Sequence, residues 1–166
     1  MKYKFDVGFN TASYIQEIDN ATQTNKNNSY NYELGFDTMF DDFPTIEVGI
    51  SRYIGHFISS LNTPKFMTTA PFATIDYRFL DGFIFNFDHG KSIYENKDLS
   101  QKNSYEIANA TWFYKNEDSA WSYKVSAQNM FNTQFKQSNR FSEYVVLDTK
   151  TFILPRILMF SVGYNL

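Results

Sequence analysis

The chain has 166 residues, the length of one ordinary domain, and 19% of them are aromatic, which is high for a soluble protein. Its 15 Lys and Arg residues against 18 Asp and Glu residues exclude a generally basic nucleic-acid-binding protein, and they argue against a basic protein held on a membrane surface. The absence of cysteine excludes disulfides, thiolate metal sites and cysteine nucleophiles, and two histidines, His56 and His89, are too few for a His-rich metal site.

Apolar and polar residues alternate along most of the chain, as in strands that have one apolar and one polar face. The alternation starts at Tyr3, Phe5 and Val7, with no apolar signal-peptide core before it, and no apolar run is long enough for a transmembrane helix. No segment has a convincing helical period. In chain order the pattern predicts eight strands, over residues 2–17, 29–40, 45–60, 66–79, 83–96, 102–114, 119–136 and 144–166.

The predicted connections alternate between short and long. Residues 41–44, 80–82 and 115–118 form short turns, whereas the other four connections are longer and polar, as over residues 19–28 and 94–103. This asymmetry is typical of outer-membrane barrels. Several strands also alternate for 12 or more residues, beyond the about 9–11 that cross a bilayer. Aromatic residues crowd beside the short turns and predict an aromatic girdle at one membrane interface: Tyr3, Phe5, Phe40, Phe43, Phe79, Phe83, Trp112, Tyr114, Trp121 and Tyr164.

A period of two does not say which face of a strand points inward. A soluble barrel would place its apolar face inside, whereas a membrane barrel would place it outside. The connection lengths, the strand lengths and the aromatic residues favour the membrane. The predicted fold class is therefore all-β: an antiparallel transmembrane β-barrel, or a segment of one, built as an up-and-down meander of about eight long strands.

Arg52 conflicts with this pattern, because it continues the apolar face that begins at Ile46. An Arg that faces lipid in the middle of the bilayer costs about 2–4 kcal/mol. A β-bulge near Ser51 and Arg52 would turn the Arg52 side chain inward, and this is the preferred prediction. The alternative is that Arg52 lies high enough to reach the lipid headgroups.

The last forty residues contain Gln128-Asn129-Met130-Phe131-Asn132, then a polar excursion, then Pro155-Arg156 and a final alternating strand. This segment resembles the C-terminal end of TonB-dependent outer-membrane receptors and their relatives among the large outer-membrane barrels. The resemblance implies a bacterial outer-membrane location, a 22-stranded barrel with an N-terminal plug domain, and a final strand that the barrel-assembly machinery reads. Leu166 departs from the usual terminal Phe, although it keeps the end of the strand apolar.

By this resemblance the chain contributes to a transporter for nutrient uptake, with a metal chelate or an oligosaccharide as its substrate. TonB would act through a plug domain, and residues 1–166 contain neither a plug domain nor a TonB box. The chain is therefore interpreted as a single barrel segment from the C-terminal end of a receptor. Two alternatives remain: a small eight-stranded membrane barrel with a structural or adhesive role, and a soluble barrel that binds a ligand.

No catalytic, cofactor or metal site is predicted. Asp88 and His89 point to opposite faces of a strand and cannot easily form a hydrolytic dyad, and no serine lies in a nucleophile elbow, so the protein is not expected to be an enzyme. Asp41 and Asp42 are interpreted as an acidic turn, because a calcium site needs about six or more oxygen ligands.

The polar face and the long connections are the remaining candidates for ligand contact. Residues 19–28 are expected to form a mobile extracellular loop, and Asn139, Arg140, Phe141 and Tyr144 of the last excursion are weaker candidates. In a large barrel the charged residues of the polar face would line a wet lumen: Lys4, Asp6, Glu33, Asp37, Glu47, Asp76, Arg78, Asp88 and Lys124.

Overall fold

The computed structural model describes residues 1–18, 21–38, 43–59, 63–116, 118–141 and 146–165. No helix in these ranges is long and apolar enough to span a membrane. The described residues form ten strands: β1 (Lys2–Ile18), β2 (Ala21–Asp37), β3 (Thr45–Ile58), β4 (Lys65–Phe79), β5 (Phe83–Asn96), β6 (Gln101–Lys115), β7 (Trp121–Gln128), β8 (Phe135–Phe141), β9 (Val146–Phe152) and β10 (Ile157–Tyr164).

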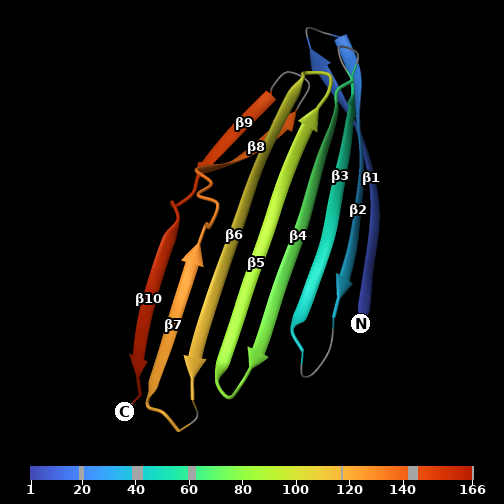
Figure 1. Ribbon diagram of the computed structural model, residues 1–166. Coiled ribbons are helices and arrows are strands. Elements are labelled where there is room, and N and C mark those ends of the chain that lie inside the picture. Colours follow the sequence, from blue (N-terminus) through green and yellow to red (C-terminus); the bar gives the residue numbers. More distant parts are fainter. Residues whose placement is uncertain (19–20, 39–42, 60–62, 117, 142–145, 166) are drawn as a thin grey trace.

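Eight of the strands form one antiparallel sheet in the order β1-β2-β3-β4-β5-β6-β7-β10, while β8 and β9 form a separate hairpin (Figure 1). The N-terminus and the C-terminus lie at the same end of the sheet, called the lower end below. The predicted all-β antiparallel meander is confirmed. The eight strands do not close into a barrel, because β1 and β10 form the two edges of an open sheet and do not pair with each other in the described residues.

The predicted alternation of short turns and long loops is wrong. Residues 21–28, expected in a mobile loop, belong to β2 and pair with β1 in a continuous register up to Ile18↔Ala21. Likewise β5 and β6 continue to a turn at residues 97–100. The polar composition of these segments suggested loops, but backbone pairing requires only a partner strand, and Thr is a good strand former.

The last two predicted strands are each shorter than expected. The strand predicted over residues 119–136 ends at Gln128, and the one predicted over 144–166 is divided into β9 and β10. Pro155 lies in the interruption between β9 and β10. A proline has no backbone N–H to give to a strand ladder, so it favours such a break.

From β3 to β10 the strands are staggered by about one residue per strand on average, as one row of paired residues shows. At β3 the row lies one residue above the lower end of the strand. At β10, which is five strands away, the row lies six residues above Tyr164, the lower end of that strand. A shift of about 3.3 Å for each strand spacing of about 4.8 Å corresponds to a tilt of about 35°, within the range of β-barrels. The row consists of Ile46, Ile75, Phe87, Ala110, Ala127 and Leu158.

The sheet is a single layer with little core. Of the described hydrophobic residues, only Phe57, Tyr94 and Ala108 are buried. The accessible surface is 11597 Å², whereas a compact protein of 19.5 kDa exposes about 8,500 Å². The surplus of about 3,000 Å² is too large for a globular fold and marks surface that lacks a covering layer.

Candidate functional site

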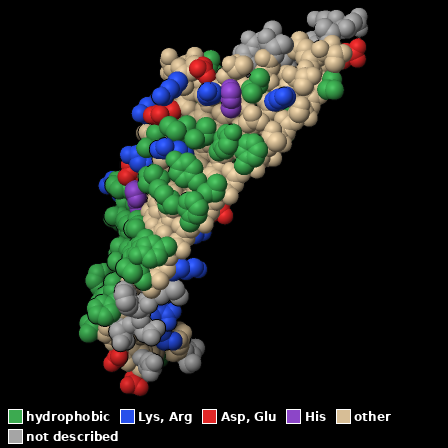
Figure 2. Space-filling view, turned by 90° about the vertical axis from the view of Figure 1, so that its right-hand side faces the viewer, with side chains coloured by type: hydrophobic (Ala, Val, Ile, Leu, Met, Phe, Trp, Pro, Cys, Tyr) green, Lys and Arg blue, Asp and Glu red, His purple; other side chains and the backbone are tan. Residues whose placement is uncertain are grey.

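One face of the sheet is apolar, because the register places the alternating hydrophobic residues of all eight strands on the same side. These side chains gather in a band, and charged side chains lie around its margins (Figure 2). They are most exposed on the two edge strands, where Phe5 is 71% exposed and Leu158 is 74% exposed. This apolar face includes Tyr3, Phe5, Val7, Phe36, Leu34, Val48, Ile50, Ile75, Phe87, Trp112, Val125, Phe160 and Val162.

Aromatic rings form a row along the lower end of the apolar face. The centroids of Phe79 and Phe83 are 5.5 Å apart, and those of Phe83 and Tyr114 are 4.3 Å apart. At the β7–β10 edge, Trp121 and Tyr164 lie 4.8 Å from each other. The predicted crowding of aromatic residues beside the short turns is confirmed for these positions. Phe40 lies outside the described residues.

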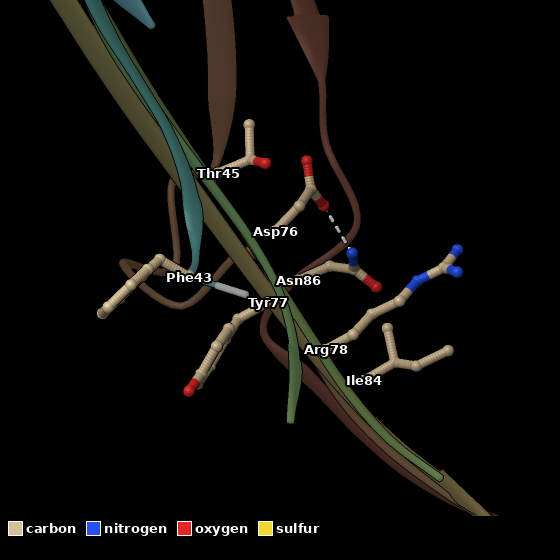
Figure 3. Close-up of a pocket in the computed structure, with 7 residues that line it drawn as sticks. All are labelled: Phe43, Thr45, Asp76, Tyr77, Arg78, Ile84 and Asn86. Carbon is tan, nitrogen blue, oxygen red and sulfur yellow. Dashed lines mark hydrogen bonds between the residues drawn. The ribbon is translucent and has the colours of Figure 1, made fainter. Parts of the chain in front are cut away.

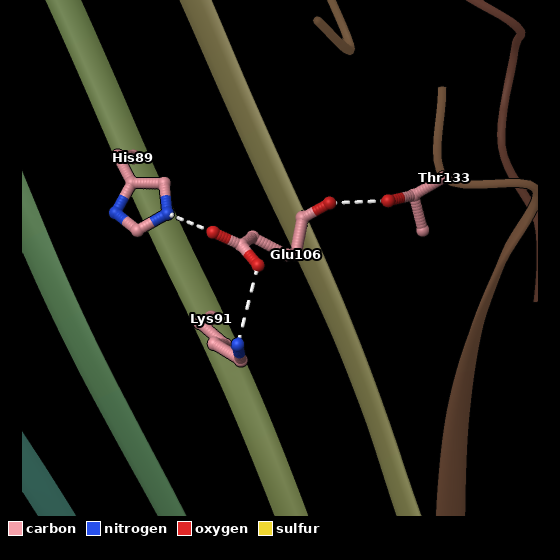
Figure 4. A network of polar contacts seen from close by, with 4 residues as sticks. All are labelled: His89, Lys91, Glu106 and Thr133. Carbon is pink, nitrogen blue, oxygen red and sulfur yellow. Dashed lines mark hydrogen bonds and ion pairs between the residues drawn. The ribbon is translucent and has the colours of Figure 1, made fainter. Parts of the chain in front are cut away.

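A charged cluster interrupts the apolar face higher on β5 and β6 (Figure 4). Glu106 lies 2.8 Å from His89 Nε2 and 3.3 Å from Lys91 Nζ. The hydroxyl of Thr133 donates a hydrogen bond to the backbone carbonyl of Glu106. Asp88 points to the other face, where it accepts a hydrogen bond from Asn109. The expectation that Asp88 and His89 do not cooperate is confirmed.

The predicted bulge at Arg52 is wrong. The pairing of β3 with β2 and β4 continues without interruption through Tyr32↔Arg52 and Arg52↔Thr69, so Arg52 stays on the apolar face. Its Nε donates a 3.1 Å hydrogen bond to the hydroxyl of Thr69. The guanidinium also lies 5.9 Å from the ring centroid of Tyr32. These contacts at the side chain hold Arg52 in place without any distortion of the backbone ladder.

A second ion pair lies beside the upper turn of β5 and β6, above the apolar residues. Glu95 and Lys102 are directly opposite each other, and Lys102 Nζ is 2.7 Å from Glu95 Oε1. The hydrogen bond from Lys102 lowers the pKa of the Glu95 carboxyl below its usual range. His56 lies at a similar position on β3, directly opposite Lys65. Ionisable side chains are therefore frequent on the upper part of this face.

The polar face carries charged residues toward its lower end. Lys4 Nζ lies 2.6 Å from Glu33 Oε1 across β1 and β2. A hollow of about 440 Å³ lies at the lower end of β3, β4 and β5 (Figure 3). Asn86 donates a hydrogen bond to Asp76 beside this hollow. Its lining consists of Phe43, Thr45, Asp76, Tyr77, Arg78, Ile84 and Asn86.

Asn129 forms several hydrogen bonds at the point where the chain leaves the sheet after β7. Its side chain accepts a 2.8 Å hydrogen bond from the backbone N–H of Thr133, and it donates 2.8 Å hydrogen bonds to the carbonyls of Thr133 and Leu154. Its backbone N–H donates to Asn109 at 2.9 Å. Asn129 is 4% exposed and has a φ of 49°, a conformation that asparagine tolerates better than most residues.

This geometry explains the two parts of the C-terminal motif. Asn132 accepts a 3.1 Å hydrogen bond from the backbone N–H of Arg156. The segment over residues 128–132 therefore contacts the Pro155-Arg156 segment directly. The sequence pattern singled out both parts but did not indicate that they contact each other. Asn129, directly after β7, and Asn132, three residues later, were the available signal, since asparagine tolerates the positive φ that both adopt.

Other candidates contribute little to a site in the described residues. Asp41, Asp42 and Tyr144 lie outside them, and so do the side chains of Asn139, Arg140 and Phe141. In the described ranges, no group of three or more His, Asp or Glu side chains is placed to hold a metal ion.

Comparisons of the chain with protein-family models, with curated proteins and with solved structures find no match.

Proposed function

We propose that the chain forms part of the wall of a larger outer-membrane β-barrel of the TonB-dependent receptor type, which takes up a nutrient. The open, tilted, single-layer sheet with one apolar face is the observation that carries this proposal. An unpaired strand edge is not tolerated in lipid. The two edges therefore require further strands, which pair with β1 and β10 and complete the barrel.

The height of the apolar face supports this proposal. Eight residues of β10 at a tilt of about 35° rise about 22 Å, close to the apolar band of about 25 Å in outer-membrane barrels. Aromatic rings at the lower end and charged groups such as Lys91 and Glu106 above match the two interfaces of a bilayer. Arg52 lies between Ile50 and Ile54 toward the upper limit, where a long side chain extends to the headgroups.

In this proposal the polar face lines the lumen, and the β8–β9 hairpin extends from it. The segment supplies wall and lumen surface, while TonB acts through a plug domain elsewhere in the receptor. The last strand, β10, is the part that the barrel-assembly machinery would read. A closed eight-stranded barrel is not favoured, because β1 and β10 lie at opposite sides of the sheet (Figure 1).

The two tryptophans provide a direct test, since Trp112 and Trp121 both lie on the apolar face near its lower end. The barrel that contains the chain, with its two edges paired and any tryptophan outside residues 1–166 replaced by Phe, is refolded into vesicles whose lipids carry bromine at defined depths, and tryptophan fluorescence is recorded. We expect strong quenching by lipids brominated near one interface and weak quenching by lipids brominated at the bilayer centre. Folded, monomeric protein without detergent, or fluorescence that no brominated lipid quenches, would contradict the proposal.

A further inference from the structure

Two adjoining hollows lie on the polar face beside the β8–β9 hairpin. The first has a volume of about 420 Å³ and extends across β3 to β6 as far as Lys136 of β8. The second has a volume of about 440 Å³ and lies between β6 and the segment over residues 151–155. Ile107, Asn109 and Lys136 line both hollows, which therefore meet there and form one groove, called the hairpin groove below. Each hollow has the size of a small-molecule site, about 300–1,000 Å³.

Opposite charges line the first hollow without pairing with each other. Asp88 of β5 and Lys136 of β8 both contribute to its lining, and neither forms an ion pair with a described residue. The carboxylate of Asp88 accepts a 2.8 Å hydrogen bond from Asn109. Lys91 also lines this hollow, but its ammonium is paired with Glu106, at 3.3 Å. Of the described charges in the hollow, one anion and one cation are therefore left for a ligand.

The second hollow carries apolar side chains on a face that is otherwise mostly polar. Phe152 and Leu154 line it and are 82% and 70% exposed, so a ligand there would cover apolar surface. Ile107 and Pro155 extend the apolar lining. Lys136 therefore borders an apolar hollow on one side and the hollow that contains Asp88 on the other.

We propose that the hairpin groove binds a short peptide whose two ends are free. The ammonium end pairs with Asp88 and the carboxylate end pairs with Lys136, while the side chain of the last residue enters the apolar hollow. A neutral sugar would leave both charges without a partner, and an anionic chelate would meet the carboxylate of Asp88. The inference rests on the proposed transport function and names a substrate class for it.

The test titrates the complete barrel that contains residues 1–166, held in detergent micelles, with tripeptides in a calorimeter. The probes are Ala-Ala-Phe, Ala-Ala-Leu and Ala-Ala-Ser, each with free ends, N-acetylated or C-amidated, together with maltohexaose and ferric citrate. We expect the free peptides that end in Phe or Leu to bind best. Blocking either end should weaken binding by about three- to tenfold, because it removes a charge-assisted hydrogen bond. No binding of any free peptide at millimolar concentration, equal binding of the blocked peptides, or tighter binding of maltohexaose or ferric citrate would overturn the inference.

Two variants assign the two ends of the peptide. Asp88→Asn keeps an acceptor for Asn109 but removes the negative charge, so it should bind free and N-acetylated peptide equally and still discriminate against the amide. Lys136→Gln should show the reverse. Asp76→Asn, in the other hollow at the lower end of the same face, is the matched control and should discriminate as the unchanged protein does.

Unchanged discrimination in Asp88→Asn, or the same loss in Asp76→Asn as in Asp88→Asn, would overturn the inference. Tryptophan quenching by brominated lipids tests the membrane proposal separately, since it does not depend on a peptide.

Discussion

Asn129 joins the C-terminal part of the chain to the sheet through its side chain. One buried side chain links the end of β7 to Thr133 and to Leu154, which precedes β10 in the chain. A short amide is suited to this role, because it both donates and accepts and tolerates a positive φ.

We expect Asn129→Ala to lower the free energy of unfolding by about 2–4 kcal/mol, because it removes the three hydrogen bonds that this buried side chain makes to the backbone of Thr133 and Leu154. Thermal unfolding in detergent micelles measures the change. Gln128→Ala is the matched control, since Gln128 is exposed on the preceding position and should change the stability little. Equal stability of the Asn129 and Gln128 variants would contradict the role assigned to Asn129.

Depth in the bilayer should determine the effect of a new arginine on the apolar face. Ile50→Arg, below Arg52, is expected to destabilise the folded protein in lipid by about 2–4 kcal/mol, whereas Ile54→Arg, above it, should cost about 0–1 kcal/mol. Urea unfolding in vesicles compares the two variants. If they are equally destabilised, Arg52 does not mark the upper limit of the apolar band.

Two glycines of the sheet, Gly55 of β3 and Gly90 of β5, differ in their surroundings. Gly55 makes room for the ring of Phe66, whereas Gly90 borders open space. Neither residue has a positive φ, so the side-chain environment, not the backbone, distinguishes them.

This contrast gives a matched pair of substitutions. Gly55→Ala should destabilise the protein by about 1–3 kcal/mol, because the new methyl group displaces the Phe66 ring. Gly90→Ala should be neutral or slightly stabilising, since it reduces the freedom of the unfolded chain without a clash. Thermal unfolding of both variants in micelles checks this order, and a reversed order would show that the Phe66 ring does not occupy that space.

At the scale of the whole molecule, the open edges can be tested with engineered disulfides, because the chain has no native cysteine. Phe5→Cys with Leu34→Cys should form a disulfide, since these residues are paired across β1 and β2. Phe5→Cys with Phe160→Cys joins the two edges and should not. Mobility on non-reducing gels, in detergent and in vesicles, measures both. A disulfide between the edges within one chain would mean that the sheet closes by itself.

Much of the sheet follows from local sequence. Alternation along Tyr3 to Phe9 and along Leu158 to Tyr164 sets which side chains share a face, because successive residues of a strand point to opposite sides. This rule sufficed to predict the meander, the aromatic row and the separation of Asp88 from His89. Sequence reasoning failed at residues 21–28, where the polar composition suggested a loop but the residues pair with β1.

The order of residues along the chain therefore determines most of the strands and the chemistry of their two faces. The tertiary structure alone decides the register at Arg52, the contact between Asn129 and Leu154, and the open edges at β1 and β10. The physical reason is the separation along the chain of the residues that interact. Side-chain alternation is a property of neighbouring residues, whereas register, tilt and closure depend on hydrogen bonds between strands that are distant in sequence.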